Sequence, residues 1–230
     1  MFETHPKDLR DLLREADEAR VQLPDFQRSY VWSESDVKGL IASIARGFPV
    51  GALLTLGSGG EVRFKPRTLA GVEVQRAEPD LLLLDGQQRV TSLHGALWSK
   101  APMRTKLKRD QRKGVDRYFY IDIQKSTQAG ADLEEAIIAV RADRRQVEDF
   151  KVVRDLSTRE AEFDAGCFPL NLAFDYQLHV WLTDWQKHWQ ARDVDVSDLQ
   201  RRFFEEVLSP IQSYKMPEIR LSQGSSREAI

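Results

Sequence analysis

The segment LLLLDGQQRVTSLHGAL, residues 81–97, constrains the fold more than any other part of the chain. The four leucines at 81–84 form a short apolar run, which is typical of a strand buried on both faces. Apolar residues then recur at helical spacing over 90–97. Residues 85–89, DGQQR, must therefore connect a buried strand directly to a helix, and we expect them to place polar side chains at the helix N-terminus.

The turn from Asp85 to Arg89 has the composition of a phosphate-binding site. Unpartnered N–H groups and the helix dipole make a helix N-terminus attract anions. Gly86 permits a tight turn and lets a ligand approach the backbone, and Arg89 offers a planar fork of donors for phosphate oxygens. Gln87 and Gln88 can hold a water molecule or a base edge. Asp85 can hold a metal-bound water, act as a base or cap the helix, and a purely structural turn is the alternative for the whole segment.

Gln27 and Arg28 form a second, weaker polar pair in the segment FQRSY, residues 26–30. They follow a Pro-Asp pair near the end of an expected strand. By themselves they are most simply a surface pair. They gain functional meaning only if the fold brings them next to residues 85–89.

The rest of the chain contains both kinds of element, and we expect an α+β fold. Ser33 followed by Asp36 resembles a helix N-terminal cap. The segments at 50–56 and 61–67 flank the turn GSGG and are expected to pair as a hairpin. The tryptophan stripe over 181–189 most simply belongs to the core. Expected helices cover 7–20, 37–45, 174–190 and 196–214, the last ending at Pro210 or soon after, and further strands cover 81–84, 116–124 and 216–221.

We expect a domain core over residues 1–155. Residues 156–230 are expected to form a helical extension or insertion that returns to this core with a final strand at 216–221. Beyond it, Ser225 and Glu228 resemble a capping box that starts another helix. We therefore expect the chain to be truncated relative to a longer protein.

Residues 100–117 are rich in Lys and Arg and are expected to form an exposed basic loop or helix. Arg63, Lys65 and Arg67 alternate along one face of an expected strand. The whole chain has a net charge of -2 and a pI near 6.1, so any contact with nucleic acid needs a local basic patch. A solvated surface is the simpler interpretation of the 100–117 stretch.

Several classes of protein are not expected. The single cysteine, Cys167, cannot form an internal disulfide, which fits a reducing cytoplasm. The charged N-terminus is no signal peptide, and no apolar run approaches the ~20 residues that span a membrane. No G-x-x-x-x-G-K-[ST] motif is present, and the four histidines and one cysteine have no zinc-ligand spacing. We expect a cytoplasmic protein with neither a membrane partner nor a metal site built from protein ligands alone.

The stretches LPDFQRSYVW, GFPVGALLTL and LLLLDGQQRVTSLHGAL together resemble the DGQQR-motif domain of GmrSD-type restriction proteins. The resemblance runs from Val21 to the end of the chain. It implies a ParB/sulfiredoxin-like fold, a mixed sheet with flanking helices and here a helical C-terminal part. It also implies a chain that continues, often into an HNH-type nuclease, in a bacterial phage-defence system. Sulfiredoxins carry a catalytic cysteine in the equivalent turn, which DGQQR lacks, so sulfinic-acid reductase chemistry is not expected.

The resemblance further implies a domain that binds, and often hydrolyses, a nucleoside triphosphate, with Mg²⁺ bridging its phosphates. The implied binding residues are Gln27, Arg28, Gly86, Gln87, Gln88 and Arg89, and the implied catalytic residues are Asp85, Gln88 and Arg89. The alternative is a ParB-like DNA-binding module without catalysis, in which Arg63, Lys65, Arg67 and the basic stretch at 100–117 would contact backbone phosphates. A nuclease in which Asp85 helps to hold a metal is the weakest hypothesis.

Overall fold

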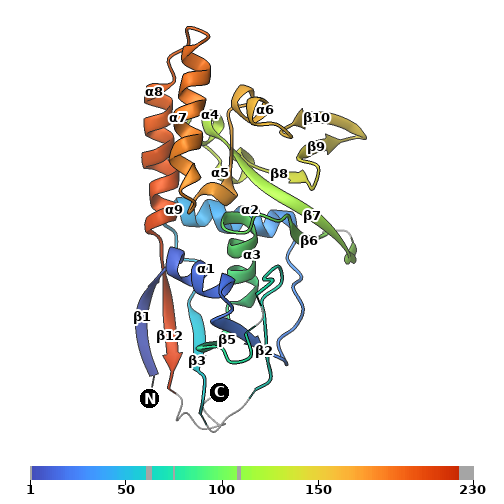
Figure 1. Cartoon of the computed structure of the whole chain (residues 1–230), viewed down its shortest axis with the longest axis vertical. Coiled ribbons are helices and arrows are strands. Elements are labelled where there is room, and N and C mark those ends of the chain that lie inside the picture. The colour runs from blue at the N-terminus through green and yellow to red at the C-terminus, as the bar shows by residue number, and fades with distance from the viewer. Residues whose placement is uncertain (1, 61–63, 75, 108–109, 223–230) are drawn as a thin grey trace.

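A six-stranded mixed sheet forms the lower half of the molecule in Figure 1. The computed structural model describes residues 2–60, 64–74, 76–107 and 110–222. The strand order is β1-β12-β3-β5-β2-β4. β12 runs antiparallel to β1 and parallel to β3, whereas β3 and β5 are antiparallel and β5 and β2 are parallel. These strands are β1 (Phe2–Asp8), β2 (Val21–Pro24), β3 (Leu53–Gly57), β4 (Pro66–Arg67), β5 (Leu81–Asp85) and β12 (Lys215–Leu221).

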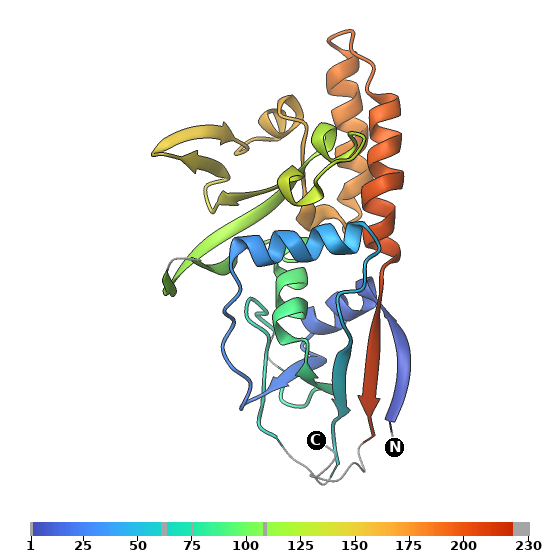
Figure 2. The same ribbon diagram turned by 180° about the vertical axis from the view of Figure 1, so that it is seen from behind.

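Three helices pack between this sheet and the rest of the molecule (Figures 1 and 2): α1 (Leu9–Asp17), α2 (Glu34–Ala45) and α3 (Gln87–Leu97). The expected capping box at the start of α2 is present, with Ser33 and Asp36 each satisfying the other's backbone N–H. Nine of the eleven residues of α3 are buried. A helix that is buried on nearly every side usually carries apolar side chains all round. The buried glutamines of α3 should therefore have hydrogen-bond partners.

A second sheet is organised around one long strand, β7 (Asp110–Asp122). β6 (Met103–Leu107) and β11 (Cys167–Pro169) pair with it along one edge, and β8 (Ile137–Arg141) pairs along the other. β9 (Arg145–Glu148) and β10 (Lys151–Asp155) form a separate hairpin. Short helices complete this region: α4 (Ile123–Ser126), α5 (Leu133–Ala136), α6 (Arg159–Asp164) and a 3₁₀ turn at Leu170–Leu172.

Two long antiparallel helical rods rise beside the second sheet (Figure 1). One is α7 (Gln177–Gln190), and the other runs through α8 (Ser197–Phe203), a π-helical turn (Phe204–Leu208) and α9 (Ser209–Ser213). Trp181 and Trp185 are buried, as expected for a core stripe. The second rod continues for three residues past Pro210, because a residue without an N–H is tolerated in the first turn of a helix, here α9.

Two expectations were wrong. β4 pairs with β2 rather than with β3, because both edges of β3 are already occupied by β12 and β5. Most described residues of the basic stretch at 100–117 lie in the strands β6 and β7, not in a loop or a helix. Its alternation is visible in β6, where Met103 and Thr105 are buried and Arg104 between them is exposed.

The expected α+β class is confirmed. The ParB/sulfiredoxin-like superfamily and the division at residue 155 stay predictions. One buried cluster contains residues from both sides of that position, from Leu9 to Met216. Arg63 and the expected capping box at Ser225 and Glu228 lie outside the described residues.

Candidate functional site

The expected strand–turn–helix junction is confirmed. β5 ends at Asp85, and α3 begins at Gln87. Gly86 between them has a φ of 101°, a left-handed conformation that favours glycine. A Cβ atom at Gly86 would lie 2.4 Å from Cδ2 of Leu53. Both the backbone conformation and the space therefore require glycine here.

The two glutamines of DGQQR hold the 28–31 segment against α3. The Nε2 group of Gln87 donates to the carbonyl oxygen of Arg28 at 2.8 Å. The Oε1 atom of Gln88 accepts from the N–H of Val31 at 2.9 Å, and its Nε2 group is 3.4 Å from the carbonyl oxygen of Ser29. Both glutamine side chains are buried. Their hydrogen bonds explain why a helix so fully packed carries amides at this end.

Gln27 and Arg28 lie next to the turn at residues 85–89. The functional interpretation of this pair required that proximity. The Gln27 amide donates to the carbonyl oxygen of Leu84, one residue before the turn. Arg67 on β4 donates to the carbonyl oxygens of Gln27 and Arg28 and supports the segment from the other side. The Arg28 side chain is exposed, and its guanidinium has no hydrogen bond or ion pair with any described residue. Within the described part of the chain it is therefore an unpaired positive charge beside the turn.

Arg89 is placed differently from Arg28. Its guanidinium donates to the carbonyl oxygens of Val50 and Ala52, both at 2.9 Å, and to Oδ2 of Asp85 at 3.1 Å. Its side chain is only 15% exposed. A Cβ atom at Gly51 would lie 2.6 Å from Nη1 of Arg89, so the loop before β3 passes directly against the guanidinium. Three of the five guanidinium N–H donors expected to meet phosphate are thus engaged, two with backbone carbonyls and one with Asp85.

Three groups at the turn remain available to a ligand. Among the described residues no side chain caps the N-terminus of α3, so its first N–H groups lack helical partners and carry the positive end of the helix dipole, while Gly86 and Gln87 themselves are buried. The Oε1 atom of Gln87 is buried without a hydrogen-bond partner among the described residues. The Asp85 side chain is 72% exposed. The turn therefore offers donors for an anion, one buried acceptor and one accessible carboxylate.

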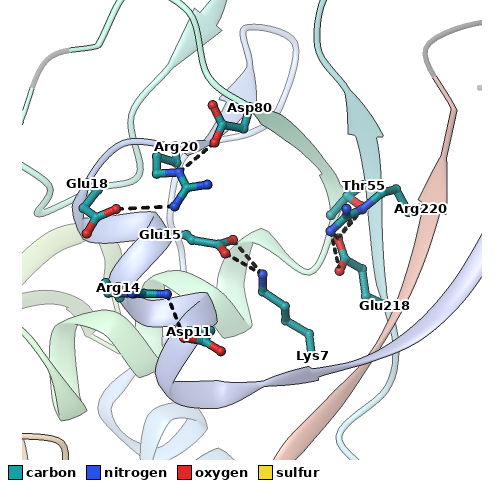
Figure 3. A network of polar contacts seen from close by, with 10 residues as sticks. All are labelled: Lys7, Asp11, Arg14, Glu15, Glu18, Arg20, Thr55, Asp80, Glu218 and Arg220. Carbon is teal, nitrogen blue, oxygen red and sulfur yellow. Dashed lines mark hydrogen bonds and ion pairs between the residues drawn. The ribbon is translucent and has the colours of Figure 1, made fainter.

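A second polar network lies away from this turn, around the start of β5 (Figure 3). Sequence analysis missed it because its partners come from distant segments. Ion pairs join Lys7 to Glu15 at 2.7 Å, Arg20 to Asp80 at 2.6 Å and Arg220 to the buried Glu218 at 3.0 Å, and Arg14 pairs with Asp11. Each cation drawn in Figure 3 is neutralised by a carboxylate. The Lys7–Glu15 pair joins α1 to β1, and the network offers less unpaired positive charge among the described residues than the turn at Gly86.

Other reactive groups are built into the core. Cys167 is fully buried, and burial raises the pKa of its thiol to about 11. His94 is buried and contacts Asp17 through Nε2 at 2.9 Å. The described residues contain no cluster of three or more His, Cys, Asp or Glu side chains suited to a metal ion. Nor does any described helix combine the length and apolar character needed to cross a membrane.

The fold and this turn define an α+β domain in which a central strand leads through a left-handed glycine into an uncapped helix, with two loops fixed beside it. The chain belongs to the family of the GmrSD restriction endonuclease N-terminal domain, whose family model matches residues 9–229. The expected family is confirmed, and membership indicates a component of a restriction system. The chain is also 33% identical over 147 residues to the uncharacterized protein MJ0686 of Methanocaldococcus jannaschii. That alignment covers 61% of this chain and 24% of the relative, so the chain spans about a quarter of that relative's length.

Proposed function

We propose that this domain binds a nucleoside triphosphate at the turn Gly86–Arg89. The observation that carries the proposal is the uncapped N-terminus of α3, which has the buried and unpartnered Oε1 atom of Gln87 beside it. Buried polar groups are nearly always hydrogen-bonded in native proteins. A ligand that both accepts from the helix N–H groups and donates to this oxygen would satisfy the site, and a nucleotide has both kinds of group.

The geometry supports distinct roles for the two arginines. The N–H groups at the start of α3 bind phosphate oxygens, and the free guanidinium of Arg28 adds a charge-assisted contact. Arg89 and Gln88 act mainly as positioning residues, because their polar groups hold the loops at 50–52 and 29–31. In this arrangement Arg89 contacts phosphate only through the guanidinium N–H groups that do not already donate to these carbonyl oxygens.

Hydrolysis is the second part of the proposal. Asp85 is the accessible carboxylate of the turn, and it orients a water molecule toward the γ-phosphorus. The water oxygen forms the new bond to phosphorus while the bond to the bridging oxygen breaks, giving a nucleoside diphosphate and inorganic phosphate. Mg²⁺ commonly binds through one or two carboxylates, several waters and the substrate phosphates. A single carboxylate at the turn fits that mode.

We further propose that nucleotide binding regulates a modification-dependent restriction system that acts against phage. Family membership supports this role. The partner would be a nuclease region, of HNH type in the resemblance, carried on the same protein or on another subunit. In that arrangement the nucleotide state of this domain would control when the nuclease acts.

The test is calorimetric titration of the 230-residue chain with ATP, GTP and CTP in the presence of Mg²⁺. We expect at least one nucleotide to bind, and we expect Arg28→Ala to weaken that binding at least tenfold, as about 1.4 kcal/mol predicts for one lost charge-assisted contact. Arg192→Ala removes an exposed arginine on α7's C-terminal side and is the matched control. A folded chain that binds none of these nucleotides, or equal binding by the Arg28 and Arg192 variants, would contradict the proposal.

A further inference from the structure

Positive charge is concentrated in one short segment of an otherwise acidic chain. Residues 104–117 contain seven basic and two acidic residues, a net charge of +5. The whole chain has 34 basic and 36 acidic residues, so the remainder has 27 basic and 34 acidic residues, a net charge of -7. The basic residues of the segment are Arg104, Lys106, Lys108, Arg109, Arg112, Lys113 and Arg117.

The described residues of this segment, 104–107 and 110–117, lie in the strands β6 and β7, which form a ribbon that projects from the side of the molecule (Figures 1 and 2). β8 pairs with β7 only from Arg117 onward, and β11 pairs with it only from Tyr120 onward. Among the described residues, the part of β7 before Arg117 therefore pairs with β6 alone. On the other edge of β6, the N–H of Lys106 donates to the carbonyl oxygen of Trp32 at 2.9 Å. Beyond this contact the described part of the ribbon is two-stranded, and Arg112 and Lys113 there are exposed.

The orientation of the ribbon is fixed by burial. Met103 and Thr105 are buried against the rest of the domain. Because side chains alternate along a strand, Arg104 and Lys106 share the opposite face. Gly114 lies opposite Lys106 in the register. A Cβ atom at Gly114 would be 2.5 Å from Nε of Arg104, so the arginine lies flat across the glycine.

Arg117 pairs with Glu34 at 3.0 Å, but the other described cations of the segment are weakly compensated. Lys106 and Arg112 have no ion pair with any described residue. Arg104 is 67% exposed and lies 3.4 Å from Asp116, and Lys113 is 73% exposed and lies 4.0 Å from Asp110. Exposed pairs at such distances contribute little and exchange readily for another anion. The ribbon therefore presents net positive charge to solvent.

We infer that the β6–β7 ribbon binds the phosphate backbone of duplex DNA. A polyanion complements its charge, and the attraction is focused because the rest of the chain repels the same polymer. The major groove of B-form DNA, about 12 Å wide, admits a two-stranded β-ribbon, whereas the major groove of A-form RNA is too narrow. This surface belongs to a different sheet from the turn at Gly86, and the inference does not depend on nucleotide binding there.

The test measures binding of the 230-residue chain to a labelled duplex of about 20 base pairs by fluorescence anisotropy, between about 50 and 200 mM salt. The variant Arg104→Gln/Lys106→Gln/Arg112→Gln/Lys113→Gln removes four described cations of the ribbon. We expect it to bind at least tenfold more weakly, and we expect its salt slope to be shallower by about 3–4, at about 0.9 per phosphate contact.

The control variant removes four exposed cations elsewhere and has the same net charge: Arg14→Gln/Lys187→Gln/Arg192→Gln/Arg201→Gln. It should bind within about twofold of the parent chain. Equal losses in the two variants would show that only overall charge matters, and an unchanged ribbon variant would place any DNA contact elsewhere. Competition by duplex RNA or by polyglutamate as effective as by duplex DNA would also overturn the inference. Circular dichroism confirms that each variant is folded.

Discussion

The Nη1 group of Arg89 donates to the carbonyl oxygen of Val50 at 2.9 Å and so joins the first turn of α3 to the loop that precedes β3. The same guanidinium also reaches the carbonyl oxygen of Ala52. The arginine of DGQQR thus maintains the shape of the turn through the backbone of another segment. Arg28, in contrast, is exposed and unpaired among the described residues. At this site Arg89 therefore contributes to stability, whereas Arg28 supplies positive charge at the surface. Replacing the two arginines should have different effects on stability.

Arg89→Ala should lower the free energy of unfolding by about 2–3 kcal/mol, because it leaves two carbonyl oxygens of a packed loop without their charged donor. Arg89→Lys should cost less, since it keeps the charge but loses the planar fork. Arg28→Ala should change stability by no more than about 0.5 kcal/mol. Urea denaturation measures the free energy of unfolding of all three variants. Equal losses for Arg28→Ala and Arg89→Ala would contradict a special role of Arg89 in stability.

Gly86→Ala should be more destabilising than Gly130→Ala. Both glycines have positive φ, 101° and 71°, so each alanine incurs left-handed strain of about 1–2 kcal/mol. A Cβ atom at Gly130 meets nothing within 4 Å, whereas one at Gly86 meets the Leu53 side chain. Thermal unfolding of the two variants compares them. Equal losses of stability in the two variants would show that the contact with Leu53 adds no cost beyond the left-handed backbone strain.

Glu162 should make stability fall as pH rises. Burial raises the pKa of this carboxyl, although the Trp181 indole, Arg159 and the Tyr120 hydroxyl, which hydrogen-bonds Glu162, act in the opposite direction. A raised pKa favours the protonated form in the folded state, so the stabilisation is complete below the ordinary value of 4.5 and is lost above it.

Relative to Glu162→Gln, the parent chain should therefore lose stability as the pH rises above the ordinary value of 4.5. Denaturation of both proteins at a series of pH values on either side of 4.5 measures the difference. Parallel pH profiles would show that Glu162 titrates normally. A gain for the parent chain at higher pH would show that the arginines around it outweigh burial.

Cys167 should be inert while the chain is folded. Burial raises the pKa of its thiol to about 11, and the thiolate is the reactive form. Because the chain has one cysteine, each alkylation event reports on this residue. Iodoacetamide at about pH 8 should label the unfolded chain rapidly and the native chain only as it unfolds. Rapid labelling of the native chain would contradict the burial of this side chain.

The local features of the fold were predictable from sequence. The junction at 85–89 was correct because a buried strand pattern and a helical pattern meet there without a gap. The start of α2 was also correct, since Ser33 and Asp36 form a cap from residues three apart. β1 was missed, because nearly all of its side chains are exposed and no buried alternation marks it.

Long-range relationships were not predictable. The pairing of β4 with β2 depends on which strands already occupy the edges of β3, and no local pattern contains that information. The same limit applies to the site. DGQQR indicated a special turn, but the acceptors of Gln87 and Arg89 are backbone carbonyls of residues 28, 50 and 52. Such partners cannot be identified from residue type, because every residue carries a carbonyl.

The position of β12 bears on how the chain folds during synthesis. β12 inserts between β1 and β3, so Phe2 pairs with Leu221. While the ribosome is still producing the middle of the chain, β1 has no partner strand and one edge of β3 is open to foreign strands. Contacts of such large sequence separation form slowly. The larger sheet can be completed only after residue 221 has left the ribosome, so the strand order leaves one edge of β3 without its partner strand until synthesis has reached that point.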